Sequence, residues 1–386
     1  MLPDESDKLK LADEFANFFS NKILNIRQSI LMNRNFGNNI HIETTVKDNI
    51  FPFSAFEPID KESVKCMIDS TKDKYSSIDD IPQCMIRKTI YSSSNYLLDI
   101  INYCFSHGVF PQCLKLSHIT PIVKSMKEDL EMFSNYRPIS ILSFLSKLIE
   151  KCVLVQLLNH LDQNNLSYHY QSAYKSYHSC ETALLKIYDD ILHMLDSRSY
   201  VFMLFLDFSS AFDTVDHHIL LEKLEKNFYV KGMALKWFKS FLSNRQFKVN
   251  VEGNFSKHYS ANYGVPQGSV LGPILFSLYS QEVSKIIESY GFNVHMFADD
   301  IQIYFQCDDL NSKLPLLKSC FNEIKLWANN NFLKLNDKKT KLLVISSKLR
   351  KFNLPTSLFE NYCCEPSVRN LGFIIDRERE TFGAQH

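Results

Sequence analysis

The spacing of hydrophobic residues along the chain predicts a protein of alternating helices and short strands. Apolar positions recur with helical periodicity over residues 11–26, 61–71, 81–90, 96–105, 142–161, 212–227, 236–242 and 316–330. Shorter apolar runs are typical of strands and cover residues 119–123, 246–251, 257–262, 342–346 and 371–375. The run VFMLFL, residues 201–206, is apolar without a break, which predicts a strand buried on both faces.

Turn and breaker residues indicate where several of these elements begin and end. Gly108 and Pro111 end the helix of residues 96–105. Pro138 and Ser140 stand where we expect the next long helix to begin. The polar, Asn-rich stretch of residues 33–49 predicts a linker. A further helix is expected to run from the turn GVPQGSVLGP to about residue 290.

One carboxylate, Asp207, directly follows the continuous apolar run. An unpaired carboxylate at the end of a buried strand costs free energy, so it must be solvated, paired or bound to a metal. Capping the N-terminus of the following helix is the alternative. On Asp207 alone, the cap is at least as good an interpretation as the metal site.

Two more carboxylates, Asp299 and Asp300, are adjacent between short apolar segments that we expect to be strands. Neighbouring like charges raise each other's pKa unless a cation compensates them, and an ordinary hairpin would carry Asn-Gly or Asp-Gly. A plain turn remains the alternative. If the strands lie side by side, their ends bring Asp207 and Asp299 together. Such oxygen ligands suit Mg²⁺, and two ions about 4 Å apart would activate an attacking hydroxyl and stabilise pyrophosphate as it leaves.

The segment GVPQGS, residues 264–269, is a third candidate for chemistry. Its two glycines permit close approach of the backbone, and the N-terminus of the following helix favours an anion. A plain Gly/Pro loop is the alternative, and for this segment alone it is the better one.

Several segments occur in the order found in reverse transcriptases of non-LTR retrotransposons. The palm motifs of that family are similar to LFLDFSSAFDTVDH, GVPQGSVLGPILF, MFADDIQIY, LKLNDKKTKLLVI and VRNLGFIID. Its fingers motifs are similar to PIVK, NYRPISILSFLSKLIEK and QSAYKSYHSCETAL. The resemblance runs from about His118 to Asp376, and pieces upstream of it resemble jockey-like and chicken-repeat-like elements.

This resemblance implies an α+β right-hand polymerase fold with fingers and palm, in which helices back a small palm sheet. Residues 1–115 would be a mostly helical region upstream of the polymerase, residues 116–376 the fingers and palm, and residues 377–386 a tail outside the family pattern. The family continues into a helical thumb, so we expect the thumb to be missing or incomplete. Grip on template and primer would then be weak, which lowers processivity before it abolishes chemistry.

The resemblance also assigns catalytic roles. Asp207 and Asp299 would bind two Mg²⁺ ions, with Mn²⁺ as a substitute, and Asp300 would support the site. The backbone carbonyl of Phe208 would be a further ligand. Lys339 would help pyrophosphate to leave. A surface position is the alternative for Lys339.

For the nucleotide, the resemblance implies a second set of residues. A ring at Phe212 would lie under the sugar and exclude a 2′-hydroxyl, although the helical pattern alone favours core packing there. Gln267 and Gly268 would border nucleotide and template. Lys124 and Arg137 would hold the triphosphate, the arginine through a bidentate fork, with a surface position again as the alternative. The partners would be deoxynucleoside triphosphates, an RNA template and a DNA primer, recognised mostly by backbone and shape.

Overall charge does not support this picture, because 43 basic residues balance 43 acidic ones and nucleic-acid enzymes are more often basic. A local basic stretch exists, which is either a solvated face or a nucleic-acid contact: Lys334, Lys338, Lys339, Lys341, Lys348, Arg350 and Lys351.

The ten cysteines are scattered without a C-x-x-C pair, so we expect reduced thiols in an intracellular protein of cytoplasm or nucleus. The polar start lacks the pattern of a signal peptide, and no apolar run approaches the ~20 residues of a membrane span. The sequence leaves the oligomeric state, the template RNA and the genomic target open.

Three other interpretations remain. The chain could be a catalytically inactive retroelement fragment that keeps the fold. The tripeptide DHH, residues 216–218, could belong to a metal phosphoesterase, although no further His/Asp cluster completes such a site. A polymerase of the group II intron or telomerase type is the third, but the motif spacing favours the retrotransposon branch.

Overall fold

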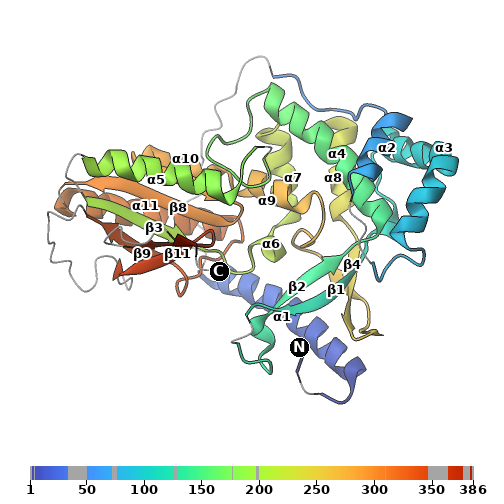
Figure 1. The fold of residues 1–386 in the computed structure, drawn as a ribbon, viewed down its shortest axis with the longest axis horizontal. Helices are drawn as coiled ribbons and strands as arrows, with labels where there is room; N and C mark the ends of the chain where they lie inside the picture. The colour runs from blue at the N-terminus through green and yellow to red at the C-terminus, as the bar shows by residue number, and fades with distance from the viewer. Residues whose placement is uncertain are drawn as a thin grey trace. The chain divides into compact units, whose positions relative to one another are not determined.

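A computed structural model describes residues 2–3, 5–33, 50–71, 76–125, 128–175, 177–196, 200–308, 310–346, 364–376 and 383–384, and it has a mixed α+β fold (Figure 1). Two compact units alternate along the sequence. The first unit comprises Met1–Ser29, Thr44–Leu166 and Phe212–Leu275, and the second comprises Ile30–Glu43, Ser167–Ala211 and Phe276–His386. The expected linker falls almost wholly outside the described residues, and the expected division of the sequence at residue 115 stays a prediction.

The first unit is built around a mixed sheet. Its strand β1 (Leu116–Val123) pairs antiparallel with β2 (Tyr136–Ile141) and parallel with β4 (Arg245–Val251). Strand β4 also pairs antiparallel with β5 (Asn254–Phe255) and β6 (Tyr259–Ala261), and β4 and β6 confirm the strands predicted over residues 246–251 and 257–262. The long helix α1 (Lys8–Asn33) packs on this sheet through buried side chains that include Leu11, Phe15, Phe19, Ile119, Phe247 and Val249.

Several helices complete this part of the fold: α2 (Lys61–Asp69), α3 (Gln83–His107), α4 (Phe144–Gln163), α6 (Ala211–Thr214), α7 (His217–Lys226), α8 (Gly232–Leu242) and α9 (Gly272–Ser280). Two short 3-10 helices, η1 (Gln112–Leu114) and η2 (Phe133–Asn135), precede β1 and β2 respectively. The buried indole of Trp237 on α8 packs edge-on against the rings of Phe56 and Phe110.

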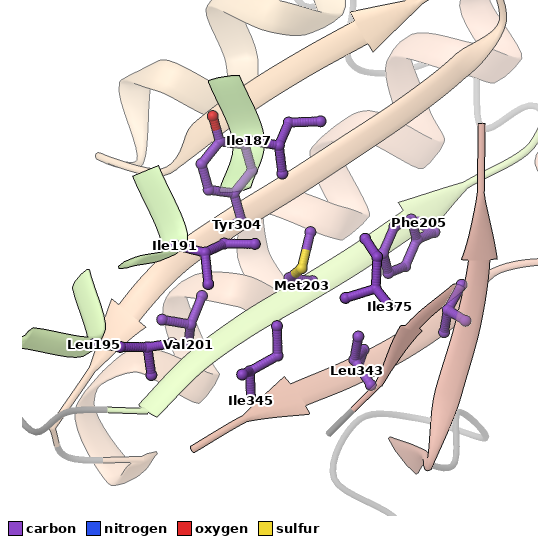
Figure 2. Packing of buried hydrophobic residues seen from close by; sticks show 11 residues of the cluster. Ile187, Ile191, Leu195, Val201, Met203, Phe205, Tyr304, Leu343, Ile345 and Ile375 are labelled. Atoms are coloured by element: carbon purple, nitrogen blue, oxygen red, sulfur yellow. The ribbon is translucent and has the colours of Figure 1, made fainter. Parts of the chain in front are cut away.

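The second unit holds a sheet with the strand order β10 (Cys364–Glu365), β9 (Lys341–Ile345), β3 (Tyr200–Leu206), β8 (Asp300–Cys307) and β7 (Asn293–Phe297). All seven residues of β3 are buried, which confirms the predicted central strand. Helix α5 (Cys180–Asp196) covers one face of this sheet. Figure 2 shows Ile187, Ile191 and Leu195 of α5 packed on side chains of the strands, among them Val201, Met203, Tyr304 and Leu343.

The remaining elements of the second unit are the helices α10 (Glu282–Ser289) and α11 (Leu310–Asn330) and a small sheet of β11 (Ser367–Asn370), β12 (Phe373–Asp376) and β13 (Gly383–Ala384). None of the helices in the described part of the chain is long and apolar enough to cross a membrane. The nine cysteines in that part are free thiols, as predicted, and Cys363 lies outside it.

The predicted helix start at Pro138 and Ser140 is wrong. Both residues belong to strand β2, which is at the end of the strand order of its sheet. An edge strand tolerates proline because its missing N–H is not needed for a ladder. Helix α4 begins instead at Phe144, where the Ser143 side chain accepts a hydrogen bond from the Ser146 amide as an N-cap.

Three further element predictions need correction. The helix expected over residues 212–227 is divided into α6 and α7, because the Asp216 side chain accepts hydrogen bonds from the His218 and Ile219 amides and starts a new helix. The helix expected up to residue 290 is divided into α9 and α10. The last strand, expected over residues 371–375, is wrong in its start, since Leu371 and Gly372 form the turn between β11 and β12.

Candidate active site

Three carboxylates gather at one end of the sheet in the second unit, and we call Asp207, Asp299 and Asp300 the carboxylate cluster. The last residue pair in the register of β3 with β8 is Leu206 with Ile301. Asp207 directly follows this pair along the chain and Asp300 directly precedes it, so both carboxylates stand at the same end of the two strands. Asp299 lies in the two-residue turn between β7 and β8. The predicted meeting of the two strand ends is confirmed, and the close approach of Asp207 to Asp299 stays a prediction.

The turn that presents Asp299 has an unusual backbone. Ala298 has a φ of 57°, a left-handed conformation that side chains other than glycine rarely adopt. The buried side chain of Gln171 holds it, because its Oε1 accepts a hydrogen bond of 3.1 Å from the Ala298 amide. Such strain persists only where surrounding contacts fix it, and it is common at functional sites.

The carboxylates act on one another electrostatically. Asp300 keeps an exposed surface, yet its pKa is raised to about 6 by reduced hydration within the protein and by the negative charges of Asp299 and Asp207, against the opposite effect of Lys339. The pKa of Tyr174 is also raised, by reduced hydration within the protein and then by the negative charges of Asp299 and Asp300. Negative charge therefore accumulates at this end of the sheet.

The segment that follows α11 contacts Asp207 through Asn336 and Lys339. The Asn336 Nδ2 donates a hydrogen bond of 3.0 Å to Asp207 Oδ2, and the Asn336 amide donates one of 2.8 Å to the Asp207 carbonyl. The Lys339 Nζ lies 3.3 Å from both carboxylate oxygens, although 62% of the lysine side chain remains exposed. An exposed ion pair of this kind is weak and readily exchanged.

The carboxylate cluster opens into a cavity of about 270 Å³. Asp207 and Asp300 line it together with three basic side chains, Lys339, Lys341 and Arg369. Among the residues that the structure describes, no three His, Cys, Asp or Glu side chains are already arranged around a common metal position. The donor set is nevertheless all oxygen and multiply negative, which is the chemistry that Mg²⁺ selects.

Phe208 contributes its backbone to the site and its side chain to the core. Its ring is 3% exposed and lies 6.4 Å from the ring of Trp327. Phe208 forms an isolated antiparallel bridge with Leu335, in which the Asp207 carbonyl and the Ser209 amide make the hydrogen bonds. The Phe208 carbonyl is outside the hydrogen bonds of this bridge, and its expected role as a metal ligand stays a prediction.

The residues expected to hold the triphosphate lie in the first unit, on the hairpin of β1 and β2. Arg137 pairs with Ile122 in the register, and the amide of Lys124 donates to the carbonyl of Asn135. Since side chains alternate along a strand, Lys124 and Arg137 project from the same face of the hairpin. Both are exposed, and the Lys124 Nζ donates to the Ser134 carbonyl.

The segment GVPQGS, which we call the PQG loop, fits tightly against β2. Gly268 has a φ of 121°, and a Cβ on it would collide with the Ser140 carbonyl. The Ser140 amide in turn donates a hydrogen bond of 2.7 Å to the Gln267 carbonyl. Glycine is therefore required at this position by both backbone angle and space.

Phe212 adjoins the same loop. Its carbonyl accepts a hydrogen bond of 2.8 Å from the Val265 amide. The first unit thus brings together Phe212, Gln267 and Gly268, while the second unit brings together Asp207, Asp300 and Lys339. The roles assigned to these residues stay predictions.

Some residues at these sites were not found from the sequence. Asn336 and Gln171 hold the carboxylate cluster, and Glu150 holds the segment after the PQG loop. Glu150 is fully buried and accepts hydrogen bonds from Ser146 Oγ and from the amides of Val270 and Leu271. A charged residue inside the apolar pattern of a helix was the available signal for Glu150. Asn336 is part of the quoted motif LKLNDKKTKLLVI, but the motif does not indicate its partner.

The DHH tripeptide has a structural explanation. Asp216 caps helix α7 and accepts a hydrogen bond of 2.6 Å from Arg27, which completes an ion pair. His217 Nε2 lies 2.7 Å from the Gly264 carbonyl, to which it donates, and His218 is exposed. These contacts account for Asp216 and His217 without a phosphoesterase site.

The basic stretch is only partly described. Lys334, Lys338 and Lys339 are exposed and Lys341 is half-buried, whereas Lys348, Arg350 and Lys351 lie outside the described residues. Exposure is compatible with either a solvated face or a nucleic-acid contact, so the two alternatives remain.

Comparison with known proteins gives a consistent result. A family model described as "Reverse transcriptase (RNA-dependent DNA polymerase)" matches residues 125–375. The probable RNA-directed DNA polymerase from transposon BS of Drosophila melanogaster is 27% identical and aligns with 97% of this chain and 42% of its own length. That of transposon X-element from the same species is 28% identical over 86% of this chain and 36% of its own length.

The RNA-directed DNA polymerase from mobile element jockey of Drosophila funebris is 27% identical, over 83% of this chain and 35% of that protein. The chain thus spans 35% to 42% of the length of these relatives. Among solved structures, an apo telomerase from Candida tropicalis, truncated from the C-terminal domain, aligns with 81% of this chain and 63% of its own at 17% identity. Its TM-score of 0.47 is too low to carry an argument.

Proposed function

This chain belongs to the reverse transcriptase (RNA-dependent DNA polymerase) family, and from that premise we propose that it polymerises DNA on an RNA template by two-metal nucleotidyl transfer. It is related to the polymerases of the non-LTR retrotransposons BS, X-element and jockey. The observation that carries the proposal is the carboxylate cluster, in which Asp207 and Asp300 stand at the same end of β3 and β8 and line one cavity.

The residues of the cluster suit a divalent cation. Three carboxylates in this position oppose one another, as the raised pKa of Asp300 indicates, and a cation would relieve their repulsion. Mg²⁺ is the natural choice for carboxylate oxygens, and Mn²⁺ accepts the same ligands. When bound, two such ions would activate the primer 3′-hydroxyl and neutralise the pyrophosphate leaving group.

In this proposal each member of the cluster has its own task. Asp207 and Asp299 hold the ions, with the Phe208 carbonyl as a further ligand, and Asp300 adds negative charge beside them. Lys339 lies 3.3 Å from Asp207 and is largely exposed, so it can leave that weak pair and present its charge to the pyrophosphate.

Nucleotide binding is proposed for the residues of the first unit. Lys124 and Arg137, on one face of the β1–β2 hairpin, hold the triphosphate, and the guanidinium of Arg137 offers two parallel donors. Phe212 excludes a 2′-hydroxyl and so selects deoxynucleotides. Gln267 and Gly268 border the nucleotide and the template, where the tight approach of Gly268 to Ser140 fixes the loop.

The template–primer duplex would be an RNA–DNA hybrid recognised by its backbone and A-like shape, with little sequence readout. We assign the fingers and palm of a right-hand polymerase to residues 116–376 and an upstream helical region to residues 1–115. The described secondary structure supports this assignment, since α1 to α3 precede β1.

Primer extension by the purified chain tests the proposal. An RNA template with a DNA primer, deoxynucleotides and Mg²⁺ is compared with the same mixture containing EDTA and with an Asp299→Asn, Asp300→Asn variant. Asp189→Asn serves as the matched control, because Asp189 is an exposed carboxylate on α5. We expect extension by the wild type and the control only. A folded wild type that adds no nucleotide at high primer–template concentration would establish the alternative, an inactive retroelement fragment.

A further inference from the structure

The side chain of Asp213 is hydrogen-bonded to Gln267 of the PQG loop. We propose that Asp213 is a positioning residue that fixes which end of the Gln267 amide is presented to the nucleotide. The inference rests on the proposed function, because that function gives Gln267 its nucleotide. It adds a residue whose side chain acts only through another side chain.

The contact itself is short and lies in a rigid frame. The Gln267 Nε2 donates a hydrogen bond of 2.7 Å to Asp213 Oδ1. The backbones of the two segments are joined as well, since the Gly264 amide donates to the Val215 carbonyl at 2.8 Å. A Cβ on Gly264 would come within 2.7–2.8 Å of the Asp213 backbone. The two side chains therefore meet in a geometry that the backbone already fixes.

The chemistry of the pair determines the orientation of the amide. An ionised carboxylate can only accept hydrogen bonds, so the NH₂ end of Gln267 must face it and the Oε1 end is left as an acceptor. A protonated Asp213 has an O–H that can donate to Oε1, so both orientations become possible. The charge on Asp213 thus selects one of two amide orientations.

Packing does not make this selection. Asp213 and Gln267 both line a cavity of about 240 Å³ in the first unit. The O and NH₂ ends of an amide are nearly equal in size, so the opposite orientation needs no displacement of the backbone. The hydrogen bond is therefore the feature that distinguishes the two orientations.

Charged and titratable groups from three packed elements face the same region. Lys22 of α1 and Arg245 of β4 line the cavity as cations, while Asp216 is neutralised by Arg27. Burial raises the pKa of Asp213 to about 6, although Gln267 and Lys22 lower it. Burial also lowers the pKa of His217 on α7, whose Nε2 contacts the Gly264 carbonyl. Asp213 is thus ionised at neutral pH and loses its charge in mildly acidic solution.

Steady-state kinetics of primer extension at saturating Mg²⁺ test the inference. For Asp213→Asn at about pH 7.5, we expect the KM for the deoxynucleotide to rise about tenfold with little change in kcat, as for the loss of one charged hydrogen bond. Near pH 5.5 only about a quarter of wild-type Asp213 stays ionised, so the wild-type KM should rise about threefold. The ratio of variant to wild-type KM should accordingly fall to about threefold.

This ratio removes the effects of other groups. Asp300, whose pKa is also about 6, and His217 titrate in both proteins and cancel. The matched control is Asp69→Asn, an exposed carboxylate on α2, for which the ratio should stay near one at both pH values. A KM ratio that does not change with pH would mean that Asp213 has only a structural role. The same conclusion would follow if Asp213→Asn lowered kcat and Tm together with the rise in KM.

A measurement without substrate separates this inference from the polymerase proposal. In protein labelled with ¹⁵N-glutamine, the side-chain amide signal of Gln267 is assigned by its loss in Gln267→Ala. We expect it to titrate near pH 6 in the wild type and not in Asp213→Asn. A wild-type signal that does not titrate overturns the positioning role even if the chain polymerises. If the signal titrates but the wild type adds no nucleotide, the proposed function fails while the amide switch stands.

Discussion

Carboxylates in the two units have opposite kinds of neighbour. In the second unit, Asp300 faces Asp207 and Asp299, and these negative charges help to raise its pKa to about 6. In the first unit, buried or half-buried carboxylates accept hydrogen bonds from N–H donors: Glu150 from two backbone amides, and Asp216 from two amides and Arg27. The carboxylate of Asp300 is therefore repelled by its acidic neighbours, whereas those of Glu150 and Asp216 are hydrogen-bonded to theirs.

This difference separates a binding site from a structural contact. Hydrogen-bonded carboxylates lower the free energy of the folded chain and fix loops, as Glu150 does for the segment after the PQG loop. Carboxylates that lie close to one another raise the free energy of the folded chain, and a bound cation is needed to offset their repulsion. Substitutions in the carboxylate cluster should accordingly affect activity, and substitutions of Glu150 and Asp216 should affect stability.

The largest effect is expected on catalysis. We predict that Asp207→Asn lowers the single-turnover rate of nucleotide addition by about a thousandfold or more, equivalent to about 4 kcal/mol. The free energy of unfolding should change little, because Asn keeps the hydrogen bond with Asn336 and loses only an exposed ion pair with Lys339. Rapid-quench kinetics and urea unfolding on the same preparations measure both quantities. Equal losses of activity and stability would remove the contrast between the units.

The second largest effect is expected on stability in the first unit. Glu150→Ala leaves the buried amides of Val270 and Leu271 without their acceptor. We predict a loss of about 3 kcal/mol in the free energy of unfolding, as for other broken buried polar networks. Urea denaturation followed by far-UV circular dichroism measures it.

Glu150→Gln is the matched control for this prediction. Its amide oxygen can still accept from both backbone amides, so we expect it to retain at least half of the lost stability. If Glu150→Ala were as stable as the wild type, the carboxylate would not be holding the segment, and the comparison between the units would lose its best example.

The sequence indicated the strands at this site better than the register that joins them. The buried strand before Asp207 and the adjacent pair Asp299 and Asp300 were visible as local patterns, and the structure has β3, β7 and β8 at these places. The register of β3 with β8 could not be predicted, because it joins strands about a hundred residues apart. A local pattern contains no information about such a register.

The errors in the predicted secondary structure also arise from contacts that a local pattern does not show or that it outweighs. Pro138 suits both the first turn of a helix and an edge strand, and only the pairing of β2 with β1 decides between them. Asp216 separates α6 from α7 because its side chain accepts hydrogen bonds from the amides of His218 and Ile219. This N-cap residue was visible in the sequence, but the apolar periodicity favoured one continuous helix. Gln171, which holds the turn at Ala298, is the first residue of the quoted motif QSAYKSYHSCETAL, but the motif does not indicate its distant partner.

A smaller effect should distinguish the cap of α7 from the proposed chemistry. Asp216 accepts hydrogen bonds from two amides and pairs with Arg27, and both side chains are at most 14% exposed. We predict that Asp216→Ala costs about 1–2 kcal/mol of unfolding free energy, as for other N-caps. A double-mutant cycle with Arg27→Ala should show a coupling of at least about 0.5 kcal/mol. If folded Asp216→Ala adds nucleotides at the same rate as the wild type, a catalytic role for Asp216 of the DHH tripeptide is excluded.

The smallest effect concerns pH and gives the most direct measure of charge at the carboxylate cluster. The pKa of Asp300 is about 6 in the folded chain against an ordinary 3.8, so the folded state holds this proton more tightly than the unfolded state. Its contribution to stability is therefore present below about pH 4 and is lost as the pH rises towards 6. Mg²⁺ needs the ionised form, so we predict that it raises the Tm more near pH 7.5 than near pH 5.5. In Asp300→Asn this pH dependence of the Mg²⁺ effect should be reduced. Asp213, whose pKa is also about 6, titrates in both proteins and therefore cancels from the comparison. An equal rise in Tm at both pH values, measured by differential scanning fluorimetry, would mean that Mg²⁺ does not bind at Asp300.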